Sequence, residues 1–379
     1  MAAPTGVSGA LASRWRRFDG ADRLAGIDLA RGLAVIGMFA AHLLWIPALT
    51  WSDPATWTDV ANGRSSILFA TLAGLSIGLV SGGRAPVDGE RLSFVRARLA
   101  ARAGLLWLLG LVLIATGVPV YVILPAYAVL FLLALPFLPL PARVLLPLAA
   151  GLALVLPVAQ ALLDDLPFWG TEVGEAVALL VGWHYPFTTW IVFVLCGLGL
   201  GRLDLRALRV QAALLVVGLV VAAAAYGLDA VSGADRDGEA ASLWGAIWTA
   251  RAHSTGLLEV VGSGGFAVAA IGLCLLLCRT ALRWLFVPLR AVGAMPLTAY
   301  TAQILVWAGV AAAVLGATGD LADFRSLDPF WPMALGTIVG CTAWTVLVGR
   351  GPLEWAFDRL TRLIARASAP APGPGAAPR

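Results

Sequence analysis

Ten separate apolar runs, each long enough to cross a membrane, dominate this chain. A hydrocarbon core needs roughly 17–25 apolar residues in a spanning helix, and inside it the backbone polar groups must be hydrogen-bonded within the segment. The runs occupy residues 24–47, 63–82, 98–116, 119–138, 143–163, 186–203, 208–228, 257–279, 291–315 and 331–349. We therefore predict an all-α, polytopic transmembrane helical bundle with about ten spans.

The overall composition agrees with a membrane protein. Of the 379 residues, 60% are hydrophobic and only 13% are charged, whereas soluble domains carry roughly 25% charged residues. A water-soluble fold could not bury so much apolar surface, so we expect a multi-pass protein of the plasma membrane. The four cysteines lie inside apolar runs, which indicates no disulfide framework. No basic tract suggests a nucleic-acid partner.

The distribution of arginine predicts the orientation of the bundle. Arginines gather in the N-terminal segment, in the second, fourth, sixth and eighth connections and in the C-terminal segment, whereas the other connections are acidic. Positive charge accumulates on the cytoplasmic side of membrane proteins. Both termini are therefore predicted to be cytoplasmic, and a wrong number of spans would break the alternation.

The two ends of the chain differ from its middle. Residues 1–22 are polar and rich in arginine, and residues 359–379 end in a tract of proline, alanine and glycine. Neither segment has the apolar periodicity of a packed helix, so both are predicted to be disordered cytoplasmic segments. Residues 23–358 form the predicted transmembrane domain. Within it, the stretch 174–183 is too short to span and is expected at the membrane interface.

The first span carries three ionisable residues, Asp28, Arg31 and His42. Charged groups inside a span are costly and are functional hypotheses by default. Helical periodicity places all three in one stripe, where Asp28 and Arg31 are spaced to pair. His42 follows about 20 Å further along the same face, at 1.5 Å per residue. The alternative is an ion pair that anchors the helix at the membrane boundary and a histidine that merely packs.

The three histidines, His42, His184 and His253, all fall on the predicted outer side. Imidazole is the usual proton carrier near neutral pH, so any of the three fits a general base there. The sequence does not decide which one acts, because His184 and His253 also fit ordinary loop positions. The spacing matches no zinc motif, and no metal site is predicted.

Other polar groups gather on the same predicted outer side. Asp59 and Arg64 lead into the second span, and Glu259 follows His253 at the start of the eighth. Arg64 fits an anionic or sugar ligand, but it also fits an arginine that reaches lipid headgroups. Glu259 is placed to orient a histidine.

Several stretches resemble known membrane acyltransferases. Asp28-x-x-Arg31-Gly32, followed by His42 at the far end of the span, resembles the opening of bacterial membrane acyltransferases that acetylate sugars. The stretch GRSSILFATLAGLSIGL (63–79) resembles the second span of the heparan-alpha-glucosaminide N-acetyltransferase-like family. The later stretches HSTGLLEVVGSGGFAVAAIGLCLLL, VGAMPLTAYTAQ and RGPLEW resemble the C-terminal half of a related bacterial inner-membrane family whose function is not established.

The resemblance implies an integral membrane acyltransferase. In the eukaryotic acetyltransferase the acetyl group passes from cytosolic acetyl-CoA to a glucosamine on the far side of the membrane. The resemblance implies acetyl-CoA or another acyl-CoA as the donor substrate, no bound cofactor, and an envelope sugar or glycolipid as the acceptor. The proposed histidine of that enzyme lies in the loop after the first span. Here this loop (48–62) contains no histidine, so His42 is the nearest candidate.

The hypothesis assigns His42 as general base or transient acyl carrier. Asp28 and Arg31 would shape the donor site. The predicted acceptor site consists of Asp59, Arg64, His253 and Glu259. Two other readings stay open: a transporter or lipid-binding membrane protein without catalysis, and a structural or regulatory membrane protein. Membrane lipid is an expected partner, and a homodimer is left open.

Overall fold

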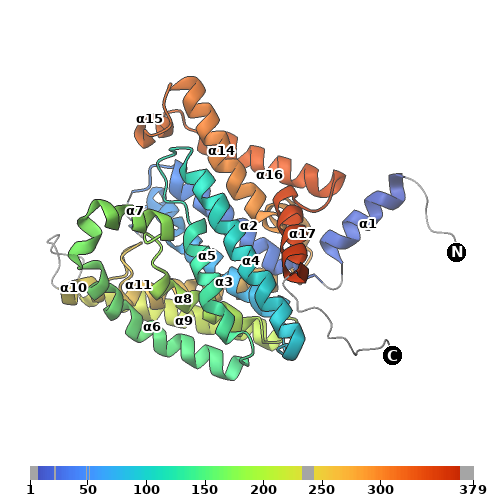
Figure 1. The fold of residues 1–379 in the computed structure, drawn as a ribbon, viewed down its shortest axis with the longest axis horizontal. Coiled ribbons are helices and arrows are strands. Elements are labelled where there is room, and N and C mark those ends of the chain that lie inside the picture. The colour runs from blue at the N-terminus through green and yellow to red at the C-terminus, as the bar shows by residue number, and fades with distance from the viewer. Residues whose placement is uncertain (1–6, 21–22, 48, 51, 233–242, 368–379) are drawn as a thin grey trace.

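The computed structural model describes residues 7–20, 23–47, 49–50, 52–232 and 243–367, and these residues form helices and no strands (Figure 1). The predicted all-α membrane bundle is therefore confirmed. Eight helical segments are long and apolar enough to span. They are α2 (Ala25–Leu43), η1 with α3 (Pro54–Ala61 and Arg64–Val80), α4 (Gly89–Ile114), α6 (Ala142–Asp164), α9 (Leu208–Ser232), α11 (Leu257–Leu277), α14 (Pro296–Val314) and α16 (Phe330–Leu347).

Two shorter apolar helices account for the remaining predicted runs. They are α5 (Leu124–Ala134), which η2 (Leu135–Phe137) continues, and α8 (Phe187–Leu200). The connections before them, residues 115–123 and 182–186, fold into the bundle, where Val118, Val122 and Tyr185 are buried. The number of complete crossings and the cytoplasmic location of the termini stay predictions.

The bundle has a buried centre and a lipid-facing periphery. Most residues of α2, α3 and α8 are buried, whereas α4, α6, α9 and α16 turn many leucines and valines outward. A Cβ atom on Gly74 of α3 would lie 2.0 Å from the carbonyl oxygen of Val194 on α8. A Cβ atom on Gly197 of α8 would lie 1.9 Å from the carbonyl oxygen of Thr71. Glycine is therefore required where these two backbones touch.

Short helices cover the two ends of the bundle. One end carries α1 (Val7–Asp19), α12 (Leu282–Leu285), α13 (Val287–Ala294) and α17 (Pro352–Ala367). The opposite end carries η3 (Pro167–Gly170), α7 (Glu172–Val181), α10 (Leu243–Ile247) and α15 (Leu321–Ser326). Figure 1 shows α1 and α17 on one side of the bundle, and α7 and α10 on the other side. The stretch predicted at the interface, 174–183, is thus mostly helical.

The N-terminal segment corrects a prediction. Residues 1–22 were expected to be disordered, but α1 is helical from Val7 to Asp19. Phe18 is buried against the bundle, and Asp19 pairs with Arg283 and Arg290. Two aromatic side chains, Phe18 and Trp15, which stacks on Trp284, and two ion pairs hold a helix whose apolar residues are too few to give a periodic signal. Residues 1–6 lie outside the described residues.

The C-terminal boundary also differs from the prediction. The transmembrane domain was expected to end at residue 358, but α17 continues to Ala367. Thr361 and Ala365 are buried beyond that boundary, because α17 packs one face against α4. Residues 368–379 of the predicted disordered tail lie outside the described residues.

Candidate active site

The three histidines meet at one cavity of about 520 Å³, which we call the histidine cavity. His42 reaches it from α2, His184 from the connection before α8, and His253 from the connection before α11. The sequence predicted all three on one side of the membrane, but their convergence needed the tertiary structure. The remaining polar lining residues are Asn62, Ser65, Ser66, Tyr121, Asp164, Tyr185, Ser254, Thr255, Tyr300 and Arg325.

His42 lies in the last turn of α2 and is held from α14 and α15. The side-chain amide of Gln303 lies 3.3 Å from Nδ1 of His42. Arg325 donates to the carbonyl oxygen of His42 at 3.0 Å and to that of Ala41 at 3.2 Å, which satisfies carbonyl groups at the end of α2. The backbone and the ring of His42 are therefore both positioned.

The orientation of the Gln303 amide decides what the His42 ring can do. If the amide nitrogen faces Nδ1, then Nδ1 accepts and the proton resides on Nε2. If the amide oxygen faces Nδ1, then Nδ1–H donates and Nε2 is free to accept a proton. The structure places the amide nitrogen against Nδ1 and leaves the Gln303 amide oxygen buried without a partner among the described residues. A general-base role for Nε2 of His42 therefore requires the opposite orientation of the Gln303 amide.

His253 stands in a strained loop that Glu259 holds. His253 and Thr255 have φ values of 64° and 56°, in the left-handed region that a β-branched residue such as Thr rarely adopts. The buried carboxylate of Glu259 accepts from the backbone N–H groups of His253 and Thr255, each at 2.6 Å, and from the Ser254 hydroxyl at 3.2 Å. Glu259 thus orients the backbone of His253 rather than its ring.

The protonation of His253 follows from its surroundings. Its side chain lines the histidine cavity and is exposed, and desolvation by the protein atoms around it lowers the pKa of His253. Burial also lowers the pKa of His184, whose ring stacks on Tyr121 with centroids 3.5 Å apart. A lowered pKa keeps both rings neutral, and therefore able to accept a proton, at neutral pH.

Asp59 and Arg64 do not line the histidine cavity. Arg64 donates to the Tyr226 hydroxyl at 2.9 Å and to the backbone carbonyl of Asp59 at 3.0 Å. The Asp59 carboxylate accepts from the Asn62 amide at 3.2 Å. Together they fix the turn that leads into α3. Of the predicted acceptor-site residues, the structure therefore brings His253 to the cavity and Glu259 directly behind it.

A second cavity of about 310 Å³, the arginine cavity, opens near the other end of the bundle. Arg31, Arg98, Arg102 and Arg350 line it, together with Glu354 and Asp358 of α17. Basic side chains of this kind suit phosphate groups. Arg31 was predicted as a donor-site residue from the sequence. Arg98 and Arg102 were not, because they resemble ordinary positive charges at the predicted cytoplasmic end of a span.

Acidic residues of α17 pair with part of this basic lining. Asp358 pairs with Arg98, Arg362 and Arg350, the last at 2.6 Å. Burial would raise the pKa of the Asp358 carboxyl, but its hydrogen bond to Arg350 and the arginine charges lower it overall. Arg102 has no ion pair among the described residues and lies over the Phe357 ring at 5.8 Å. Glu354 of α17 acts on Arg102 electrostatically, but the four arginines outnumber the two α17 carboxylates that line the arginine cavity.

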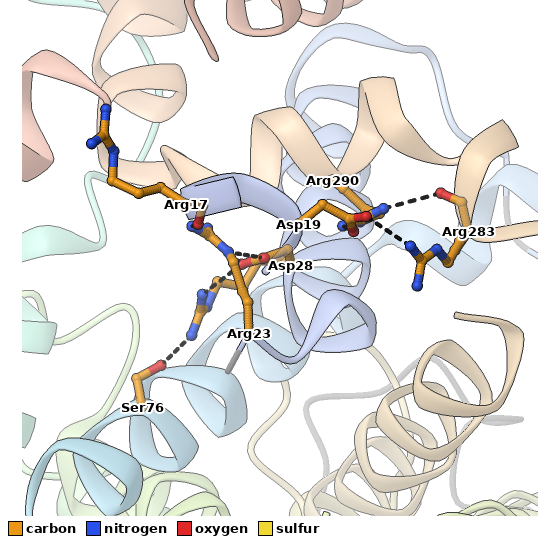
Figure 2. A network of polar contacts seen from close by, with 8 residues as sticks. Arg17, Asp19, Arg23, Asp28, Ser76, Arg283 and Arg290 are labelled. Carbon is orange, nitrogen blue, oxygen red and sulfur yellow. Dashed lines mark hydrogen bonds and ion pairs between the residues drawn. The ribbon is translucent and has the colours of Figure 1, made fainter. Parts of the chain in front are cut away.

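The predicted Asp28–Arg31 pair forms. Asp28 is buried and accepts from Arg31 at 3.3 Å and from Arg23 at 2.5 Å, and Arg31 donates to the Ser76 hydroxyl at 2.7 Å. Figure 2 shows Asp19 nearby, with Arg283 and Arg290 beside it. Arg31 lines the arginine cavity and Asp28 does not, so Asp28 holds Arg31 in place. Their role as donor-site residues stays a prediction.

The two cavities lie back to back along one seam. Helices α2, α3 and α14 contribute to both. On α3, Ser66 lines the histidine cavity and Phe69 lines the arginine cavity, about 4.5 Å apart along the helix axis. At the start of α5, Ile123 lines the histidine cavity and its neighbour Leu124 lines the arginine cavity. A partition of about one helical turn, which includes Phe69, Ile123 and Tyr127, separates the cavities.

An apolar groove of about 630 Å³ runs between α14 and α16. Gln303 lines this groove and also contacts His42, so the groove adjoins the histidine cavity. Gly336 and Gly340 widen it, since a Cβ atom at either position would meet nothing within 4 Å. Among the residues that the structure describes, no group of three or more histidine, cysteine or acidic side chains is placed to hold a metal.

Two family models match the chain. The model of the heparan-alpha-glucosaminide N-acetyltransferase catalytic domain matches residues 23–228, more than half of the sequence. The chain belongs to this family. A model described as a protein of unknown function (DUF418) matches residues 200–364. No curated protein and no solved structure matches the chain.

Both matched regions build the histidine cavity of this heparan-alpha-glucosaminide N-acetyltransferase family member. His42 and His184 lie in the first region, whereas His253, Tyr300 and Arg325 lie in the second. The family and the apolar helices together identify a multi-pass membrane protein of an acetyltransferase family. The predicted resemblance is confirmed for both halves of the chain.

Proposed function

We propose that this protein transfers an acyl group, with acetyl as the first choice, from acyl-CoA in the arginine cavity to an acceptor in the histidine cavity. The observation that carries the proposal is the pair of polar cavities separated by about one helical turn, one basic and one lined by histidines. An acyl group that crosses this partition would pass from one side of the membrane to the other. Membership of an acetyltransferase family supports the choice of reaction.

The donor would bind with its phosphates among the arginines. Arg102 is the first choice for a phosphate contact, because no described carboxylate pairs with it. Arg31, which Asp28 orients, would provide a second contact. The apolar side chains of Leu72, Leu99 and other lining residues suit the uncharged arm that carries the thioester.

The acceptor would react from the other cavity. With the Gln303 amide oxygen turned to accept from Nδ1–H of His42, a hydroxyl or amine of the acceptor attacks the thioester carbonyl carbon while Nε2 of His42 takes its proton. A C–O or C–N bond forms, the C–S bond breaks, and the CoA thiolate leaves and is protonated. The acyl group can also rest on His42 as a transient acyl-imidazole before it reaches the acceptor. His253, on the same cavity, is the second choice for the base.

The acceptor would be an envelope sugar or a glycolipid. The groove between α14 and α16 supports the glycolipid, because a hydrocarbon chain in it would bring an attached headgroup towards His42 through Gln303. Transfer to lipid extract but not to soluble sugars would indicate the glycolipid.

The test uses purified protein in liposomes with radiolabelled acetyl-CoA and longer acyl-CoAs. Envelope lipids and soluble amino sugars serve as acceptors, and label transfer and CoA release are measured. A positioned base raises the reaction rate by about 10²–10⁴-fold. His42→Ala should therefore lower the rate of label transfer by that factor and remain folded. Arg102→Gln should raise KM for the donor, whereas the exposed Arg84→Gln should not.

Two results would contradict the proposal. Undiminished transfer by His42→Ala would remove His42 from the reaction. Absence of transfer with every acyl-CoA would favour a transporter or lipid-binding protein, which moves or binds a substrate without a covalent product.

A further inference from the structure

Tyr127 occupies the partition between the two cavities. It lies in the first turn of α5 and lines the arginine cavity, where its ring meets the Phe69 ring edge-on with centroids 5.7 Å apart. Its hydroxyl is also close enough to Tyr185 and Tyr300 to interact with them electrostatically. Both of these tyrosines line the histidine cavity. Tyr127 therefore stands between the proposed donor site and the proposed acceptor site.

The Tyr127 hydroxyl has no hydrogen-bond partner among the described residues, although the side chain is only 3% exposed. Buried hydroxyl groups are normally hydrogen-bonded, and one without a partner costs free energy that phenylalanine would avoid. The neighbouring Tyr300 differs in this respect, because its hydroxyl accepts from the Ile123 backbone N–H at 3.3 Å. At the boundary of the two cavities, a bound thioester would supply the missing acceptor.

We propose that Tyr127 is a catalytic residue whose hydroxyl donates a hydrogen bond to the carbonyl oxygen of the acyl thioester. The inference rests on the proposed acyl transfer and deepens it by placing the reacting carbonyl at the partition. When the acceptor attacks, the carbonyl oxygen gains negative charge, and the C–S bond then breaks as the carbonyl reforms. A donor fixed at that oxygen stabilises the charge where it develops. Tyr127 itself gains and loses no proton.

The test compares Tyr127→Phe with wild type and with Thr345→Val. Thr345 is a matched control, because its hydroxyl is also buried and unpartnered among the described residues but lines neither cavity. Loss of one such donor lowers kcat by about 10²–10³-fold in other enzymes. We expect that loss for Tyr127→Phe, with KM for acetyl-CoA changed less than about twofold, and wild-type kinetics for Thr345→Val.

An equilibrium measurement separates a catalytic hydrogen bond from a structural one. Binding of acetyl-CoA, which has the carbonyl, is compared with binding of S-ethyl-CoA, which lacks it, in the absence of acceptor. Wild type should prefer acetyl-CoA, and Tyr127→Phe should lose this preference while it binds S-ethyl-CoA as wild type does. The ratio of the two affinities is independent of how much of the variant is folded.

The outcomes distinguish the inference from the proposed function. If the wild type transfers the acyl group and Tyr127→Phe has the same kcat, the role of Tyr127 is overturned and the proposed function stands. An equal loss of affinity for both CoA derivatives in Tyr127→Phe also overturns it, because the residue would then only shape the cavity. Absence of transfer by wild type overturns the proposed function, and the inference with it.

Discussion

At the scale of single residues, the histidine cavity depends on groups that do not line it. Glu259 is one of them. Its carboxylate receives three hydrogen bonds from residues 253–255, two of which hold left-handed backbone conformations. The position of His253 is therefore maintained by a buried acid one helical turn into α11.

Replacement of Glu259 by glutamine should destabilise this loop. The amide end of glutamine would present its own N–H groups to a backbone N–H, which leaves a buried donor without an acceptor. Such a loss costs about 1–3 kcal/mol, so Glu259→Gln should lower the free energy of unfolding by that amount in detergent denaturation experiments. The exposed Glu175→Gln on α7 is the control and should stay within about 0.5 kcal/mol of wild type. Equal stability of both variants would show that the loop does not need the carboxylate.

At the scale of elements, α17 closes one side of the arginine cavity. Glu354 accepts from the backbone N–H groups of Leu297 and Thr298 at 2.8 and 3.1 Å, and so caps the start of α14. One turn further, Asp358 joins α17 to Arg98 of α4. Glu354 holds the start of α14 and Asp358 holds Arg98 of α4. The shape of the arginine cavity therefore depends on how α17 packs against these two helices.

The docking of α17 should be sensitive to acid. The pKa of Asp358 is lowered in the folded protein, so its contribution to stability is present at neutral pH. That contribution is lost as pH falls below the ordinary value of about 3.9 towards the folded-state pKa. Asp358→Asn should therefore be less stable than wild type at pH 7, and the gap should narrow below about pH 4. Thermal unfolding of both proteins at pH 7 and at pH 3.5 measures this difference in stability.

The control for this experiment is Asp204→Asn, which breaks the exposed pair with Arg84. Exposed pairs contribute about 0–1 kcal/mol, so this variant should resemble wild type at both pH values. A gap for Asp358→Asn that is the same at pH 7 and pH 3.5 would contradict the ionic origin of the docking.

At the scale of the whole molecule, the sequence predicted the helices and one face of the site. Long apolar runs must be helical in a bilayer, and the 3.6-residue period placed Asp28, Arg31 and His42 on one stripe. The meeting of His184 and His253 with His42 was not predictable, because it depends on two irregular connections. The loop around His253 has left-handed φ values that no residue type there indicates, and Tyr127 resembles an ordinary aromatic residue of an apolar helix.

The orientation of the molecule can be tested in whole cells with single cysteines in connections on opposite sides. In a background without the four native cysteines, Asp53→Cys should react with a membrane-impermeant maleimide in intact cells. Arg84→Cys should react only after permeabilisation, because the arginine-rich connections are predicted to be cytoplasmic. The reverse pattern would invert the predicted donor and acceptor sides.

The thin partition between the two cavities also bears on the electrical properties of the molecule. A bilayer normally spreads the membrane potential over about 30 Å of hydrocarbon. Where water fills polar cavities from both faces, nearly the whole potential falls across the single helical turn that includes Phe69, Ile123 and Tyr127. Moving one charge through that field corresponds to about 2.3 kcal/mol per 100 mV. Any proton or developing oxyanion at this turn would therefore be exposed to the cell's voltage, and we expect the rate of the proposed acyl transfer to depend on the membrane potential.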